Sequence, residues 1–246
     1  NEVVVRASDF QFDGRLAIPG GPTTFRLVND GPDYHHLWLV RLEDGHTLDE
    51  LLAHLGTGHA PPPWARDVGG PNTPGAPGEE TIATLDLTPG SYAMLCVIPS
   101  PDGVPHIAKG MARALTVEPA VGTAAALPAA DLVMTLDDYS FIVDRPITPG
   151  THTIRVHNVA SQPHEVLIVR LEPGRTVEEF AGWVEAREGP APGRPIGGTT
   201  GMAQGEWNLI TRTFEEGDYG LLRFIPDATD GAPHIVHGMM SQIRVG

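Results

Sequence analysis

The sequence predicts an all-β protein made of two tandem β-sandwiches, each with one short inserted helix. Three observations support this prediction. Apolar residues alternate with polar ones in many short runs, which is typical of half-buried strands. The 246 residues include 29 glycines and 24 prolines, and these stand between the runs as turn residues. A long segment of the first half recurs in the second half, which indicates a duplicated domain.

Five strand-like runs stand out in the first half. They read "TFRLVN", "HLWLVRL", "TIATLDL", "SYAMLCVI" and "ARALTVE", at residues 24–29, 36–42, 81–87, 91–98 and 112–118. With weaker runs beside them, they indicate about seven short strands per half, the number typical of a β-sandwich.

Two segments break the period of two and predict short helices. These are "TLDELLAHL" (47–55) and "TVEEFAGWVEAR" (176–187), at similar places in the two halves. Each opens with a threonine that a glutamate follows three residues later. This is the capping-box pattern, in which both residues satisfy the free N–H groups of the first turn.

The internal repeat divides the chain. Residues 18–45 align with 147–174 at an offset of 129, and "DGVPHIAKGM" (102–111) aligns with "DGAPHIVHGM" (230–239) at an offset of 128. We therefore expect a first domain at 1–118, a linker at 119–130 rich in small apolar residues, and a second domain at 131–246.

Composition limits the classes of binding partner and the cellular compartments that are expected. The net charge of −15 argues against nucleic acid or an anionic membrane as partner and favours a basic protein. No apolar run reaches the roughly 18 residues that a membrane-spanning helix needs, so no membrane insertion is expected. The chain opens on the strand-like "NEVVVRASDF" without a leader, which suggests a mature secreted protein, periplasmic or extracellular. A cytoplasmic origin stays an alternative, because the single cysteine gives no disulfide evidence.

One loop carries a thiol, an imidazole and a thioether, the donors that copper prefers. These are Cys96, His106 and Met111 in "CVIPSPDGVPHIAKGM". Blue copper sites need a second imidazole, and a single loop cannot surround the metal. His35, at the head of a distant strand, supplies it. His36 is expected to point to the opposite face of the strand from His35, which predicts a surface or interface residue.

At these residues the sequence resembles the cupredoxins, the blue copper family that includes plastocyanin, azurin and the first domain of copper nitrite reductases. The resemblance covers nearly the whole chain and implies Greek-key sandwiches. It implies one type 1 copper per chain, bound by His35, Cys96, His106 and Met111, and an electron-transfer function with a redox protein partner. The exposed edge of His106, among apolar neighbours, would be the docking face. The gap of nine residues between Cys96 and His106 is longer than the family usually has.

The second half lacks the thiolate, because Arg223 stands where the first half has Cys96. His164, His234 and Met239 persist there, and we favour a structural role for them. The alternative is a metal site built from His164, His234, His237 and either Met239 or Met240.

No catalytic residues are predicted, and the chain is not expected to be an enzyme. In copper nitrite reductases and two-domain laccases further histidines bind the catalytic copper; the matching positions here hold Leu95 and Val40. Substrate-binding residues could still lie in the long loops expected at 56–78 and 188–204. The alternative function is a non-redox binding or copper-handling module on the same scaffold. The oligomeric state stays open.

Overall fold

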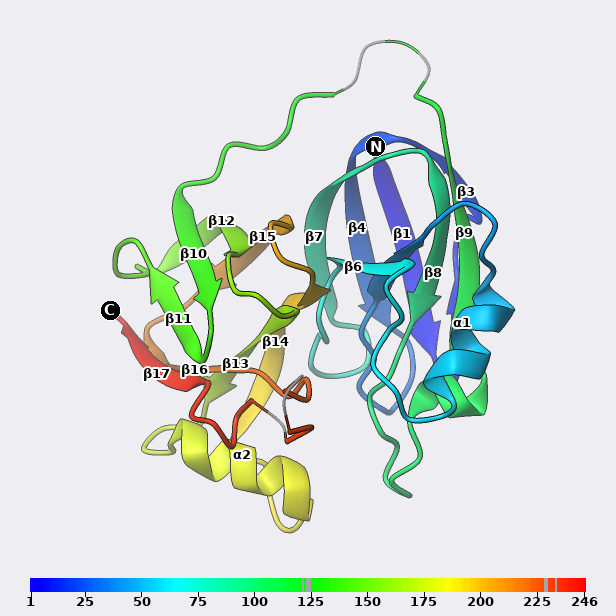
Figure 1. Cartoon of the computed structure of the whole chain (residues 1–246). Coiled ribbons are helices and arrows are strands. Elements are labelled where there is room, and N and C mark those ends of the chain that lie inside the picture. Colours follow the sequence, from blue (N-terminus) through cyan, green and yellow to red (C-terminus); the bar gives the residue numbers. More distant parts are fainter. Residues whose placement is uncertain (121, 123–124, 228–229, 233) are drawn as a thin grey trace.

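The computed structural model describes residues 1–120, 122, 125–227, 230–232 and 234–246, and it is an all-β protein with two lobes (Figure 1). In the first half the strands are β1 (Glu2–Ser8), β2 (Gln11–Asp13), β3 (Ala17–Pro19), β4 (Gly21–Asn29), β5 (Trp38–Leu42), β6 (Ala65–Gly69), β7 (Glu80–Leu87), β8 (Gly90–Leu95) and β9 (Ala112–Glu118). In the second half they are β10 (Leu132–Asp137), β11 (Ser140–Val143), β12 (Gly150–Asn158), β13 (His164–Leu171), β14 (Gly193–Met202), β15 (Trp207–Phe214), β16 (Gly217–Leu222) and β17 (Met240–Val245). The predicted fold of two tandem sandwiches is confirmed.

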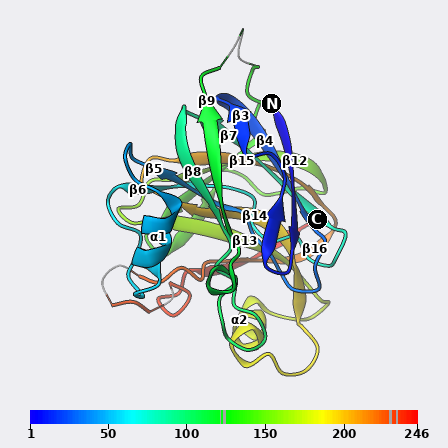
Figure 2. The same cartoon turned by 90° about the vertical axis from the view of Figure 1, so that its right-hand side faces the viewer.

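Both predicted helices are present, with the predicted caps. Helix α1 (Leu48–Leu55) begins after Thr47, and α2 (Val177–Ala186) begins after Thr176. In each, the threonine side chain accepts from the N–H of the third helical residue, and that residue's glutamate accepts from the threonine N–H. Figure 2 shows α1 on the outside of the first lobe and α2 at one end of the second. Neither helix is long and apolar enough to cross a membrane, within the part of the chain that is described.

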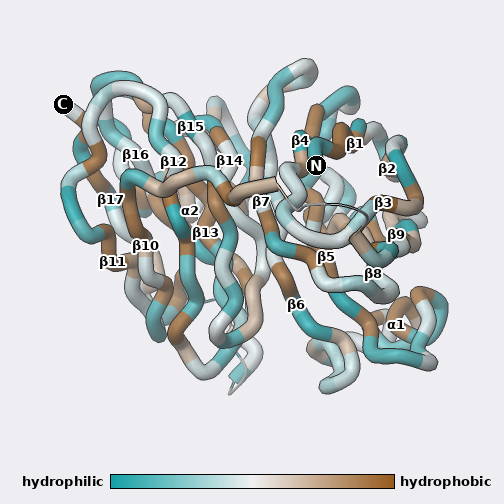
Figure 3. Tube along the Cα trace, turned by 90° about the horizontal axis from the view of Figure 1, so that it is seen from above, coloured by the Kyte–Doolittle hydropathy of each residue, from teal (hydrophilic) through white to brown (hydrophobic). Residues whose placement is uncertain are grey.

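Both sheets run through both halves of the molecule. One sheet has the strand order β11-β10-β12-β15-β7-β4-β1-β2, and the other has the order β17-β16-β13-β14-β6-β5-β8-β9-β3. The halves join where β15 pairs with β7 and where β14 pairs with β6, antiparallel in each case. Seen from above, β7 lies at the junction between the lobes (Figure 3). The two sandwiches are therefore joined edge to edge.

The strands at one of these joints lie where the sequence predicted long loops. Strand β6 falls within 56–78 and β14 within 188–204, so that prediction is wrong. The sequence of β14, "GRPIGGTTGM", has no period of two, because nearly every residue in it is buried. Gly198 has φ +126°, and a Cβ there would lie 2.0 Å from the carbonyl oxygen of Val166 on β13. Only glycine allows this close approach of the two backbones.

Asn208 on β15 connects the two halves by hydrogen bonds. Its side chain is fully buried, its Oδ1 accepts from the N–H of Gly70 at 2.8 Å, and its Nδ2 donates to the carbonyl oxygen of Val68 at 3.0 Å. Apolar packing is also continuous, because one cluster of buried side chains includes Phe25 of the first half and Ile210 of the second. The lobes are thus joined by backbone pairing, by side-chain hydrogen bonds and by a shared core.

The predicted linker, residues 119–130, is described only in part by the structure. Strand β9 ends at Glu118 and β10 begins at Leu132, with no helix or strand among the described residues between them. Residues 121 and 123–124 lie outside the described part of the chain. In Figure 1 the described residues of this connection lie at the opposite end of the molecule from α2. The domain boundaries at 118 and 131 stay a prediction.

Candidate metal centre

The four residues predicted as ligands lie in segments that meet at one end of the first sandwich. His35 lies before β5, Cys96 directly follows β8, His106 begins the 3₁₀ helix η1 (His106–Lys109), and Met111 directly precedes β9. All four residues have no exposed surface.

Three of these side chains bring their donor atoms together. The Nδ1 atoms of His35 and His106 are 3.1 Å apart, and the Sγ of Cys96 is 3.5 Å from the Nδ1 of His106. One donor atom of each residue lies within 4.8 Å of the other two. One thiol and two imidazoles, with Met111 five residues after His106, are the donor types of a type 1 copper site.

Backbone hydrogen bonds fix the loop that carries three of the four residues. The N–H of Cys96 donates to the carbonyl oxygen of Met111 at 3.2 Å, and the N–H of Met111 donates to that of His106 at 3.0 Å. Gly110 makes the reversal between them, with φ +101°. The segment therefore closes on itself before β9 begins.

Asn29 braces the segment before His35. Its Oδ1 accepts from the N–H of Gly31 at 3.0 Å, and its Nδ2 donates to the carbonyl oxygen of Asp33 at 3.0 Å. Asn158 makes the matching pair of bonds in the second half. The repeat of Asn and His that aligned the two halves is therefore one structural unit, in which the asparagine shapes the loop and the histidine ends it.

Two carboxylates lie on the far sides of the imidazoles, Asp9 within hydrogen-bond distance and Asp33 farther away, and sequence reasoning missed both. The Nε2 of His35 is 3.1 Å from the Oδ1 of Asp9, and the Nε2 of His106 is 3.5 Å from the Oδ2 of Asp33. Carboxylates in this position orient a metal-binding imidazole. The predicted exposed edge of His106 is wrong, since this ring is fully buried and Phe10 packs against it with a centroid distance of 5.1 Å.

Burial sets the protonation of the cluster. It raises the pKa of the Cys96 thiol to about 12, and it lowers the pKa values of His35 and His106. The imidazoles are thus neutral, the form that binds metals. The thiol keeps its proton until a cation is present, because only a nearby positive charge offsets the cost of a buried thiolate.

His36 is not a surface residue, so that prediction is wrong. It is 7% exposed, and its Nε2 accepts a hydrogen bond from the N–H of Val97 at 3.1 Å. Strand β5 begins only at Trp38, so the alternation of faces that predicted an outward side chain does not apply to His36.

The second half keeps the frame of the centre but not its thiol. The ring centroids of His164 and His234 are 5.0 Å apart, against 4.8 Å for His35 and His106. Arg223 is fully buried and donates to the carbonyl oxygens of Pro163 and Ile225. Burial lowers its pKa to about 10, which leaves it charged at neutral pH, and it lowers the pKa of His164 to about 4.

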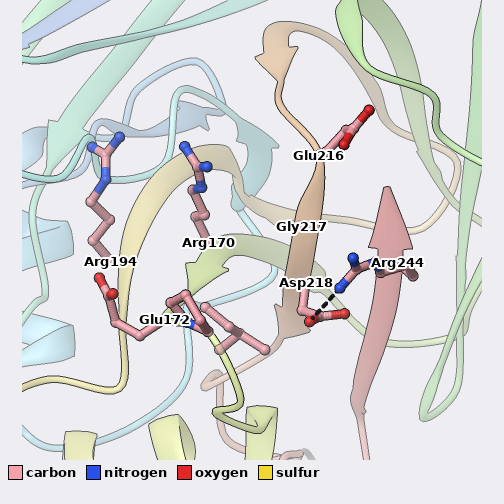
Figure 4. Close-up of a pocket in the computed structure, with 9 residues that line it drawn as sticks. Arg170, Glu172, Arg194, Glu216, Gly217, Asp218 and Arg244 are labelled. Atoms are coloured by element: carbon pink, nitrogen blue, oxygen red, sulfur yellow. Dashed lines mark hydrogen bonds and ion pairs between the residues drawn. The ribbon is translucent and has the colours of Figure 1, made fainter. Parts of the chain in front are cut away.

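A surface pocket lies elsewhere, between β13, β14, β16 and β17, and its lining offers no nucleophilic group. It has a volume of about 500 Å³ and is drawn in Figure 4, with Arg244 paired to Asp218 at 2.9 Å. Arg170 and Arg194 point into the same region, and each is paired with a glutamate outside the pocket lining. Each of the three arginines is therefore already paired with a carboxylate.

Comparison with solved structures finds copper proteins. Auracyanin from the photosynthetic bacterium Roseiflexus castenholzii is 20% identical, matching 48% of this chain and 97% of its own, with a TM-score of 0.34. A multicopper oxidase is 18% identical over 100% of this chain and 88% of its own, with a TM-score of 0.27. Copper nitrite reductase from Nitrosomonas europaea is 16% identical over 100% of this chain and 94% of its own, also at 0.27. No family model and no curated protein sequence matches the chain.

These findings correct one prediction and support another. The prediction that the chain is not an enzyme does not stand, because an oxidase and a nitrite reductase are among the matching structures. Leu95 and Val40 at the expected second-copper positions are no ground for excluding catalysis as a class. At such low identity the likeness concerns the fold. The structure itself has the two tandem β-sandwiches that the repeated sequence predicted.

Proposed function

We propose that the first half binds one type 1 copper through His35, Cys96, His106 and Met111, and that the protein transfers electrons. One observation carries the proposal: donor atoms of His35, Cys96 and His106 lie within 4.8 Å of one another in a fully buried cluster. Cys96 and His106 lie on one loop and His35 comes from a segment distant in the sequence, so the fold brings the two segments together. Bound copper would supply a one-electron change between Cu(I) and Cu(II).

The surroundings of the cluster suit electron transfer. The imidazole of His35 is held by Asp9, Asp33 lies 3.5 Å from that of His106, and the loop is fixed by its own backbone bonds. A site held this firmly reorganises little when its charge changes. Near the cluster, Val97 and Val104 are 37% and 39% exposed and offer an apolar contact surface. The net charge of −15 favours a basic redox partner, and a periplasmic or extracellular setting goes with the proposal.

Titration with Cu(II), followed by visible absorption, tests the proposal. We expect one equivalent to bind and to give an intense thiolate-to-copper band. Cys96→Ala should abolish the band and leave the far-ultraviolet circular dichroism unchanged. His35→Ala should also lose it, whereas His59→Ala, at an exposed histidine outside the cluster, should keep it.

Two results would count against the proposal. A band that survives in Cys96→Ala would show that another group produces it. Copper bound without any such band would favour the copper-handling alternative, in which the scaffold carries the ion without a thiolate bond.

A further inference from the structure

The loop that follows β16 in the second half gathers carboxylates and imidazoles at regular spacing. Asp227, Asp230, His234 and His237 lie within eleven residues. We propose that Asp227, Asp230 and His237 bind a divalent cation of borderline character, with Zn²⁺ as the expected occupant. This site is separate from the copper centre of the first half and uses none of its residues.

The spacing of the three side chains suits a single ion. The Nε2 of His237 is 3.0 Å from the Oδ2 of Asp230, and one donor atom each of Asp227, Asp230 and His237 lies within 4.8 Å of the other two. Zinc takes nitrogen and oxygen ligands at about 2.0–2.2 Å, which sets neighbouring ligands about 3.4 Å apart in a tetrahedron. Small side-chain rotations therefore bring all three to one ion. The fourth position faces solvent, because His237 and Asp230 are exposed.

Asp227 is a buried carboxylate that the fold holds in place. Its residue is 3% exposed, and its Oδ2 accepts from the hydroxyl of Tyr139 at 2.8 Å and from the Nε2 of Gln162 at 2.9 Å. The Nε2 of the fully buried His234 lies 3.0 Å from the same oxygen. Groups that fix a carboxylate in this way prepare it as a metal ligand.

The matching loop of the first half shows that the fold does not require this cluster. The N–H of Ser100 donates to the carbonyl oxygen of Val104 at 3.0 Å, and the N–H of Asp227 donates to that of Ala232 at 2.8 Å. Ser100 and Asp227 therefore occupy the same place in the two loops. A hydroxyl in the first half is a carboxylate in the second.

A second replacement removes the lysine that pairs with the aspartate of this loop in the first half. In the first half Lys109 makes an ion pair with Asp102 at 2.7 Å. The alignment "DGVPHIAKGM" with "DGAPHIVHGM" places His237 at the position of Lys109 and Asp230 at that of Asp102. A protonated ammonium has no lone pair to offer a metal, whereas an imidazole nitrogen has one. The two replacements are Ser100 by Asp227 and Lys109 by His237. Together they put three metal-binding side chains where the first half has a lysine–aspartate ion pair.

The charge and softness of the donors indicate the class of ion. Two carboxylates and one imidazole match a divalent charge, and they lack the thiol that favours Cu(I). Arg223 is a buried cation whose charge interacts with Glu165 and Asp138 as well as with Asp227. The arginine is thus shared among several carboxylates and does not neutralise the site alone.

Calorimetric titration with ZnCl₂ tests the site, using the full-length Cys96→Ser protein so that the first cluster has no thiolate. We expect one equivalent of zinc to bind. His237→Lys, which installs the residue of the first half, should weaken binding by about tenfold or more. Asp230→Asn should act in the same direction, and His59→Ala should leave binding unchanged.

His237 is exposed, so its variant should fold, and circular dichroism checks this. Co²⁺ in place of zinc should give visible ligand-field bands without a thiolate band, and these bands should disappear in His237→Lys. Zinc affinity that is equal in the parent and in a folded His237→Lys protein would overturn the proposal, as would the absence of any zinc binding. Either result leaves the copper proposal untouched, because that one is judged by the Cys96 band.

Discussion

His36 accepts a hydrogen bond through Nε2 from the backbone N–H of Val97, at 3.1 Å. The second half has the same contact with a different acceptor, since the Oε1 of Glu165 accepts from the N–H of Phe224 at 3.0 Å. His36 follows His35, and Glu165 follows the matching His164. In both halves this side chain thus binds its loop to the end of the neighbouring strand. In the first half the tied residue is next to Cys96.

Replacing His36 should therefore destabilise the fold and loosen the copper centre. His36→Ala leaves the partly buried N–H of Val97 without this acceptor, which costs about 1 kcal/mol in the free energy of unfolding. We expect this loss in urea denaturation of the metal-free protein, together with a shifted or weakened copper band. His36→Gln offers a side-chain oxygen and should recover part of both properties. Equal stability of His36→Ala and the parent protein would show that the bond contributes nothing.

Asn208 should make the two halves unfold together. It is fully buried and bonds to Gly70 and Val68 across the junction of the lobes. Asn208→Ala leaves two buried backbone groups, the N–H of Gly70 and the carbonyl of Val68, without this partner, and each loss costs about 1–3 kcal/mol. We expect the parent protein to unfold in one transition and the variant to unfold in two, as measured by calorimetry.

Thr151 serves as the control for this experiment. Its hydroxyl pairs with that of Thr213 on the exposed face of the same sheet, within the second half alone. Thr151→Ala should keep the single transition. If Asn208→Ala also unfolds in one step with only a lower midpoint, the shared core and the paired strands couple the lobes without it.

Asp67 near the junction should make stability depend on pH. It is 5% exposed, and burial raises its pKa to about 7. Between its ordinary pKa near 4 and this value, the folded protein holds a proton that the unfolded chain has lost. The free energy of unfolding therefore falls as pH rises through this range, by about 1.4 kcal/mol per pH unit, and levels off above pH 7.

Asp67→Asn should remove this contribution. We expect the difference in stability between the variant and the parent to grow in favour of the variant from pH 4 to pH 7. Asp86→Asn, at an exposed carboxylate on β7, should show no such difference. A constant difference between Asp67→Asn and the parent across this range would mean that Asp67 titrates normally.

The sequence predicted those parts of the fold whose burial alternates. Strand β4 has a regular pattern of buried and less buried residues, so its run of apolar residues was visible. Strand β14 was missed because it is buried on both faces and contains Gly197 and Gly198 at positive φ. The joint between the halves at β14 and β6 therefore could not be foreseen, since neither strand was predicted.

In the candidate site, too, some residues were predicted from the sequence and others were missed. His35, Cys96 and His106 were predicted and meet in space, because their spacing marks one strand head and one loop. Asp9 was missed although a signal existed: it stands 129 residues before Asp138, and each bonds the histidine of its own half at 3.1 Å. Extending the repeat to this pair would have found both. The face of His36 was misassigned because no strand geometry holds at that residue.

Arg223 offers the sharpest test of the duplicated frame. The rings of His164 and His234 are almost as close as those of the first half, and Met239 is fully buried. Arg223→Cys replaces a permanent charge by a thiol at the position that matches Cys96. We expect a second thiolate-to-copper band and a rise in stoichiometry from one to two copper ions. Some stability should be lost, because a large buried side chain and its two backbone hydrogen bonds are removed.

Arg223→Leu is the matched control, because it removes the charge without adding a thiol. It should bind one copper only, with the spectrum of the parent protein. Adding His164→Ala to Arg223→Cys should abolish the second band and leave the first. If Arg223→Cys folds and gains no second band, His164 and His234 do not reach a common ion. The shared frame of the two halves would then reflect packing alone, and the carboxylate loop that contains Asp227 would be the only metal-binding region proposed for the second half.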